Sequence, residues 1–196
     1  AAANFPDFAN SKENIARDLA LAKDAGFTDI VVDVRPTTGD VLFKTNLVDQ
    51  VKFMYAWIGS NYTKVERTAT WDYLQAFVDE ARKQGLRIHA AINTFVGGNQ
   101  IDGGTGLLYR DQSKAEWATQ MNMQGGITSV MNTSESTKFF NPAHPEVQTF
   151  LCDLLKDLAG YDLDGIFLDR GRFLNLQTDF SDESRKQFEA YMGGIK

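Results

Sequence analysis

The hydrophobic pattern of this chain switches repeatedly between a helical period and short apolar runs. Apolar residues at helical spacing predict helices over Ser11–Ala25, Thr68–Gln84, about 141–160 and Ser181–Tyr191. Runs rich in β-branched or other apolar residues predict strands at Thr28–Val34, Leu86–Asn93 and Gly165–Leu168. Three helix-then-strand units in a row favour an α/β fold with a parallel sheet and right-handed crossovers.

The connections between these elements are unequal in length. Links from a helix to the next strand are short, whereas long loops follow the strands. Residues 41–67 are expected to be irregular and aromatic, glycines 97–106 to mark turns, and Gln124–Ile127 to be a hairpin turn. This asymmetry is typical of a (β/α) barrel of the TIM type, whose site loops lie on one face. A flavodoxin-like open sheet is the alternative.

Charged residues end the strand expected at Gly165–Leu168. Its apolar sequence predicts a strand covered on both faces, and Asp169, Arg170 and Arg172 follow it directly. Ligands bind at the carboxyl ends of strands in α/β folds. Arginines beside Asp169 would keep its carboxylate ionised, as a nucleophile or a transition-state stabiliser requires. A purely structural ion pair is the competing interpretation.

Composition narrows the classes of function. The chain has 196 residues and a net charge of -6, so its charge does not resemble that of a nucleic-acid-binding surface. No apolar run approaches the ~20 residues that span a bilayer. One cysteine, Cys152, is expected to be buried, and two histidines are too few for a His/Cys metal cluster. The sequence therefore indicates no metal and no cofactor.

Other strand ends offer residues for the same site. Asp33 and Arg35 close the strand at Thr28–Val34, and Asn93 closes the strand at Leu86–Asn93. Arg35 could keep a carboxylate ionised, and Asn93 could hydrogen-bond a sugar hydroxyl. Equally, Asp33 could pair with Arg35 inside the barrel, and Asn93 could cap backbone groups.

Aromatic and histidine side chains supply further predicted contacts. Trp57 and Phe95 lie in expected loops, where they could stack on sugar rings, although core packing is at least as common a use. His144, at the start of a helix, could reach the site or cap the helix. His89 lies in mid-strand and is expected to be a core histidine.

Several motifs resemble one family. The stretches that carry the likeness are Phe27–Arg35 with Gly39–Phe43, Phe140–Val147, Asp164–Phe173, Asp179–Arg185 and Phe188–Gly193. They resemble strands two and four of the glycoside-hydrolase-like, α-amylase-type (β/α)8 proteins, over nearly the whole chain. The resemblance implies a partial barrel of about four βα units in a single domain, residues 1–196, forming the N-terminal half of a larger catalytic domain. Ala1–Phe5 would be the tail of strand one.

The resemblance also implies a function. Asp169 occupies the position of the strand-four nucleophile, although Phe167 stands where those enzymes carry an arginine. The chain would act on an oligo- or polysaccharide, with its acid/base residue after Lys196. The alternative is a non-catalytic carbohydrate-binding or pseudo-enzyme barrel; a barrel lyase or aldolase ranks last, since no Schiff-base lysine ends a strand.

The resemblance bears on partners and location as well. It implies a carbohydrate ligand, with neither nucleic acid nor a membrane span. Half a barrel leaves open sheet edges, so a second copy or the missing half of the barrel is expected to cover them. By analogy, the protein is expected to be secreted or periplasmic.

Overall fold

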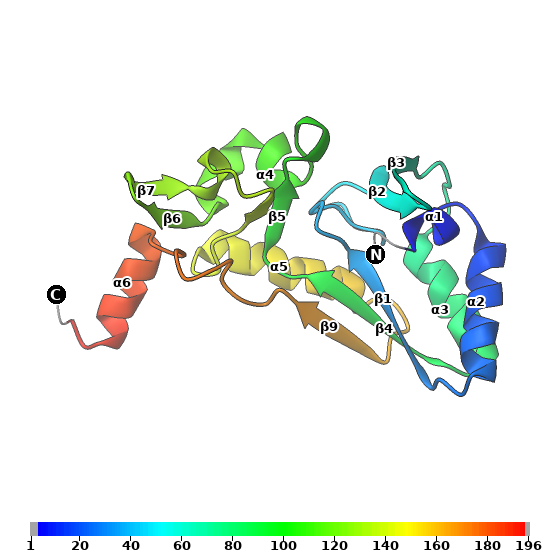
Figure 1. Cartoon of the computed structure of the whole chain (residues 1–196). Helices are drawn as coiled ribbons and strands as arrows, with labels where there is room; N and C mark the ends of the chain where they lie inside the picture. Colours follow the sequence, from blue (N-terminus) through cyan, green and yellow to red (C-terminus); the bar gives the residue numbers. More distant parts are fainter. Residues whose placement is uncertain (1–3, 195–196) are drawn as a thin grey trace. The chain divides into compact units, whose positions relative to one another are not determined.

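The computed structural model describes residues 4–194, which form two compact units (Figure 1). The first unit contains the chain up to Pro36, Asp40–Ile92 and Lys156–Asp169. The second contains Thr37–Gly39, Asn93–Leu155 and the chain from Arg170 onward.

The first unit is built on a three-stranded sheet with the order β1-β4-β9. Its strands are β1 (Asp29–Arg35), β4 (Arg87–Asn93) and β9 (Gly165–Asp169). Strands β1 and β4 run parallel, and Figure 1 shows β9 pointing the same way. All three expected strands are therefore present, and their carboxyl ends meet at one edge of the sheet.

Among the described residues, three helices lie wholly in the first unit, and Ser11 and Gly85 cap two of them as expected. They are α1 (Phe5–Phe8), α2 (Lys12–Asp24) and α3 (Tyr73–Gln84). The Ser11 side chain accepts a hydrogen bond from the Asn14 amide at the start of α2. Helix α3 begins later than the sequence predicted, because the Asp72 side chain caps it, and it ends at the left-handed Gly85.

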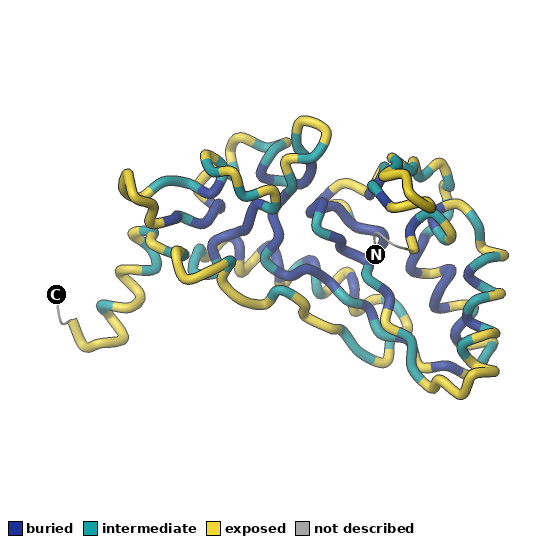
Figure 2. Tube along the Cα trace, viewed as in Figure 1, coloured by how far each residue is buried: buried dark blue, intermediate teal, exposed yellow. Residues whose placement is uncertain are grey.

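One face of the sheet forms the core of this unit. Alternate strand residues Val32, Ile88, Ala90 and Ile92 are buried, as are Leu74, Phe77, Val78 and Ala81 of α3. Figure 2 shows this buried band along β1, β4 and α3. An apolar residue at every second strand position thus meets an amphipathic helix, as the two periods predict.

Strand β9 differs from its prediction. A strand covered on both faces was expected, yet Phe167 is 57% exposed and Leu168 52% exposed. β9 lies at one edge of the three-stranded sheet, so no described strand covers its outer side. An apolar run reports a tendency to be buried, and only the neighbouring elements decide whether burial occurs.

Residues 41–67 are also more regular than predicted. They contain an antiparallel hairpin of β2 (Phe53–Ile58) and β3 (Asn61–Glu66). Met54 and Ala56 are buried on one face of this hairpin. Gly59 occupies its turn with a positive φ of 62°, so the alternation and the glycine turn were visible in the sequence.

The second unit combines short strands and helices. Its antiparallel strand pairs are β5 (Val96–Asn99) with β8 (Thr137–Phe139), and the hairpin of β6 (Gln120–Met123) with β7 (Gly126–Ser129). Its helices are α4 (Leu107–Arg110), α5 (Pro145–Leu158, ending in the first unit) and α6 (Asp182–Tyr191), with 3₁₀ turns at Ile101–Gly103, Gln112–Trp117 and Val130–Asn132. The turn predicted at Gln124–Ile127 is confirmed between β6 and β7.

Cys152 is exposed, so its predicted burial was wrong. Helix α5 buries a stripe consisting of Val147, Phe150, Leu151, Leu154 and Leu158. Position 152 falls off this stripe, which follows the 3.6-residue period. The expected tail of strand one lies partly outside the described residues, and Phe5 begins α1 instead of ending a strand.

Candidate functional site

Asp33 and Asp169 lie on the same face of the sheet, near the carboxyl ends of β1 and β9. Asp33 pairs with Ala91 of β4, which shares the face of His89 two residues earlier. A Cβ atom on Gly165 would lie 2.8 Å from Nδ1 of His89, so Gly165 and, by alternation, Asp169 occupy that face too. The topology therefore brings two carboxylates from distant parts of the sequence to one edge.

The environment of Asp33 favours its neutral form. Burial raises the pKa of Asp33, and the negative charge of Asp169 adds to the rise. Asp33 and Tyr73 line a cavity of about 240 Å³ whose other walls are mainly apolar. Burial likewise raises the pKa of the Tyr73 hydroxyl, and the Asp33 charge raises it further. These two groups are thus electrostatically coupled.

Arg35 is completely buried beside this carboxylate. The register of β1 shifts between Asp33 and Arg35, so Arg35 pairs with Ile92, which is itself buried. Burial lowers the pKa of the Arg35 guanidinium to about 10, against the opposing charges of Asp40 and Asp33. Arg35 therefore stays positive at neutral pH and offsets the acidic groups around it. The backbone amide of Arg35 also donates to Asp33 Oδ1, 3.2 Å away.

Five of the residues selected from the sequence belong to the second unit. Asn93, the last residue of β4, is buried, and Phe95 is half-buried. Arg170 has a positive φ of 48°, and Arg172 donates through Nη1 to two backbone carbonyls that follow it. His144 Nδ1 accepts a hydrogen bond from the Glu146 amide, 3.2 Å away, so this histidine caps α5.

Trp57 lies on the β2–β3 hairpin with 67% of its surface exposed. Its ring contacts that of Tyr62 at 5.3 Å between centroids, and Tyr62 stacks on Tyr55 at the same separation. Trp57 therefore belongs to an exposed aromatic cluster on this hairpin.

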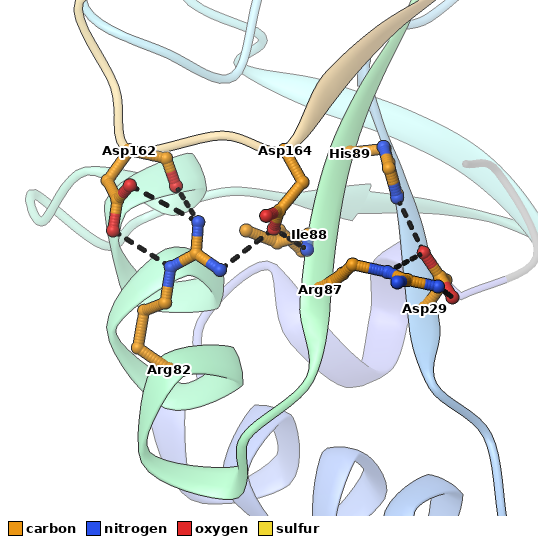
Figure 3. A network of polar contacts seen from close by, with 7 residues as sticks. All are labelled: Asp29, Arg82, Arg87, Ile88, His89, Asp162 and Asp164. Atoms are coloured by element: carbon orange, nitrogen blue, oxygen red, sulfur yellow. Dashed lines mark hydrogen bonds and ion pairs between the residues drawn. The ribbon is translucent and has the colours of Figure 1, made fainter.

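The opposite ends of the strands carry a separate polar network (Figure 3). Arg82 of α3 bridges Asp162 and Asp164, at 2.8 Å from each carboxylate. Asp164 also accepts the Ile88 amide of β4 at 2.8 Å. These contacts fix the entry into β9, and thus help to hold the strand that ends in Asp169.

A second part of this network explains His89. Its Nε2 lies 2.9 Å from Asp29 Oδ1, and Arg87 binds the same carboxylate through Nε and Nη2. His89 is thus a satisfied histidine, as predicted, although it is half-buried rather than part of the core. Residues at the amino-terminal ends of barrel strands serve stability rather than chemistry.

Sequence reasoning did not select three polar residues that the structure emphasises. Tyr73 interacts electrostatically with Asp33, and Asp40 with Arg35; Asp40 lies in the family-like stretch Gly39–Phe43 but was not selected as a site residue. Asp179 accepts hydrogen bonds from Thr119, Gln120 and Ser184, among others. The Asp-x-Ser spacing before α6 was the one available signal for Asp179.

Within residues 4–194, no group of three or more His, Cys, Asp and Glu side chains is arranged to hold a metal ion. No helix in this same range is long and apolar enough to cross a membrane.

Comparison with sequence families identifies the family to which the chain belongs. A model of the family described as glycosyl hydrolase-like 10 matches residues 2–192. The chain belongs to the glycosyl hydrolase-like 10 family. The resemblance to glycoside-hydrolase-like barrel proteins that its motifs predicted is therefore confirmed.

One curated relative of this glycosyl hydrolase-like 10 chain is an S-layer-related protein of Niallia circulans. The two are 31% identical over 198 residues, which cover 98% of the chain and 12% of the relative. The chain thus spans about an eighth of that protein's length.

Solved structures show the fold of this glycosyl hydrolase-like 10 chain. Alpha-L-fucosidase isoenzyme 2 from Paenibacillus thiaminolyticus matches with a TM-score of 0.60 and 19% identity, over 95% of the chain and 24% of the enzyme. An alpha-amylase from Lactobacillus plantarum matches with a TM-score of 0.52 and 20% identity, over 94% of the chain and 40% of the amylase. These two neighbours are TIM-barrel glycoside hydrolases of which the chain covers only a small part, which is consistent with a partial barrel.

Proposed function

We propose that this chain supplies part of the N-terminal half of a (β/α)8 glycoside hydrolase domain, with β1, β4 and β9 as consecutive barrel strands. The observation that carries the proposal is the pairing of Asp33 and Asp169. The two carboxylates share one face at the carboxyl ends of β1 and β9, close enough for the charge of Asp169 to raise the pKa of Asp33. Membership of the glycosyl hydrolase-like 10 family supports the same reaction class.

Asp169 is the proposed nucleophile. It is exposed on the open face of the sheet, where a sugar ring can approach. Its carboxylate would attack the anomeric carbon and form a glycosyl-enzyme intermediate, while an acid from outside residues 1–196 protonates the departing oxygen. Water would then release the sugar with its configuration retained.

The remaining predicted residues would bind the saccharide. In the first unit, Asp33 would accept or donate hydrogen bonds to hydroxyl groups, Arg35 would balance the acidic charge, and Trp57 would contact a ring. The second unit, taken by itself, would offer saccharide contacts through Asn93, Phe95, His144, Arg170 and Arg172. The S-layer-related relative supports a location outside the cytoplasm, which fractionation of the native host would test.

Substitution of Asp169 tests the proposal. In the full-length protein, Asp169→Asn should lower the release of reducing sugar from a panel of polysaccharides by about 10³-fold or more. Saccharide affinity, measured by affinity electrophoresis, should hardly change. Asp24→Asn, at the exposed end of α2, is the matched control and should keep full activity.

Two results would count against the assignment. Hydrolysis at the wild-type rate by Asp169→Asn would exclude Asp169 as the nucleophile. A wild-type protein that binds polysaccharide but cleaves none of the panel would instead be a carbohydrate-binding module.

A further inference from the structure

The first unit contains a second, larger pocket, with a volume of about 740 Å³. Neither Asp33 nor Asp169 is among its lining residues. Its walls come from the loop after β1, the segment between β3 and α3, and the end of α5. A volume of this size falls within the range of small-molecule sites.

Two lysines at this pocket have free ammonium groups. Lys44 and Lys52 are both exposed, and no hydrogen bond or ion pair joins either ammonium group to another described residue. Each lysine therefore presents three N–H donors and a full positive charge to a ligand. This concentration of positive charge contrasts with the chain as a whole, whose net charge is -6.

A third cation in the pocket is rigidly held. The Arg67 guanidinium donates to the carbonyls of Ala69 and Trp71, and lies 5.1 Å from the centroid of the Trp71 ring. Its Nε atom is buried with no hydrogen-bond partner among the described residues. Burial lowers the pKa of Arg67. A ligand carboxylate in the pocket would meet a guanidinium that two carbonyls already orient, so little ordering entropy would be lost.

The two carboxylates of the pocket are already engaged. Asp72 caps α3 through Oδ1 and accepts the Tyr161 hydroxyl through Oδ2 at 2.6 Å. Asp157 accepts the Thr45 hydroxyl at 2.6 Å. The lining therefore contains three cationic side chains and two carboxylates, and both carboxylates already accept hydrogen bonds within the protein. This excess of available positive charge favours an anionic ligand.

Neutral polar groups complete the lining. The side chains of Asn46 and Thr70 are exposed in the pocket and make no hydrogen bond with another described residue. They suit hydroxyl groups, which both donate and accept hydrogen bonds.

We propose that this pocket binds an acidic sugar residue. The sugar carboxylate lies among Lys44, Lys52 and Arg67, and its hydroxyl groups bond to Asn46 and Thr70. The inference rests on the proposed function for the saccharide class of the ligand, and it specifies that the recognised glycan contains uronic acid.

Calorimetric titration of the full-length protein tests this inference. The probes are trigalacturonic acid and a glucuronate-containing hyaluronan tetrasaccharide, each compared with its neutral methyl ester. The Asp169→Asn variant is used throughout, so that cleavage cannot obscure binding. At least one acid should bind about 10-fold or more tightly than its ester, because each lost charged hydrogen bond costs about that factor. This preference should weaken as salt is raised.

Variants locate the binding. Lys44→Ala and Lys52→Ala should each weaken binding of the acid about 10-fold and leave that of the ester unchanged. Lys186→Ala, an exposed lysine of α6, is the matched control and should change neither.

The inference is overturned if neither acid binds more tightly than its ester, or if both lysine variants bind the acid as the control does. Either result leaves the proposed function standing when a neutral glycan is cleaved in an Asp169-dependent manner. If no saccharide is bound or cleaved at all, the proposed function fails as well.

Discussion

Gly165→Ala would test how β9, the strand that ends in Asp169, fits against β4. A Cβ atom built on Gly165 would lie 2.8 Å from Nδ1 of His89 and 3.5 Å from its Cε1. Real Cβ atoms do not approach a neighbour at 2.8 Å, so the imidazole ring must move. Its Nε2 is held 2.9 Å from Asp29, and this contact would be disturbed.

The size of the effect follows from two opposing contributions. Overpacking of a filled site costs about 1–3 kcal/mol. Replacing glycine by alanine stabilises by about 0.4–1 kcal/mol, because the unfolded chain loses conformational freedom. The free energy of unfolding should therefore fall by about 1–2 kcal/mol.

Urea unfolding, followed by tryptophan fluorescence, measures this change through the midpoint at constant slope. Gly125→Ala is the matched control. Gly125 lies in the turn between β6 and β7 without a positive φ, and nothing lies within 4 Å of its Cβ position. This control should be neutral or slightly stabilising.

A double-mutant cycle with His89→Ala isolates the contact. In the His89→Ala background the ring is gone, so Gly165→Ala should cost nothing or stabilise. If the cost of Gly165→Ala is the same in both backgrounds, the steric explanation is wrong, and Gly165 matters for another reason.

Three further variants test the polar contacts. Asp33 has a raised pKa, so ionisation of its carboxyl group opposes folding as pH rises. Asp33→Asn should therefore raise the free energy of unfolding near pH ~7, measured by urea unfolding. This increase should vanish below pH ~4, where the carboxyl group is neutral in the unfolded chain as well. For Asp179, burial raises the pKa, but the hydrogen bonds to its carboxylate lower the pKa by more, so the net shift is downward. Asp179→Asn should therefore destabilise the fold near pH ~7, and less so as pH falls. The same pH response in the Asp33 and Asp179 variants would contradict the pKa directions. Asp72→Ala removes a helix cap and the part-buried acceptor of Tyr161. Its denaturation midpoint should fall more than that of Ser11→Ala, which removes a cap and an exposed hydrogen bond to Glu13 and costs about 1 kcal/mol; equal falls would show that the Tyr161 contact contributes nothing.

The sequence alone determined the elements that rest on local rules. Helix α2 begins at its predicted cap, Ser11, and α6 begins after Ser181, because both side chains bond to backbone amides within the next turn. The strands β1, β4 and β9 were all predicted, since β-branched and apolar runs are local signals. The family was also predictable, because its motifs are short runs of residues.

Other local signals were present but misread. Alternation of Phe53, Tyr55 and Trp57 with buried Met54 and Ala56 is a two-residue period, and Gly59 follows at the turn. These features predict the β2–β3 hairpin, which was expected to be irregular. Helix α3 was predicted to begin at Thr68, although Asp72 is a good cap and the helix begins at Tyr73, five residues later.

Only the tertiary structure decided which residues distant in the sequence become neighbours and which of them are buried. The sequence predicted that Asp33 and Asp169 end strands of one site, but the sheet face that each occupies depends on the strand order β1-β4-β9 and on the register between the strands. Burial is likewise set by neighbours: Phe167 is exposed at a sheet edge despite its apolar strand. The cationic pocket brings Lys44, Arg67 and the end of α5 together from distant positions. Local sequence specifies conformation, whereas proximity and burial arise only when distant segments pack together.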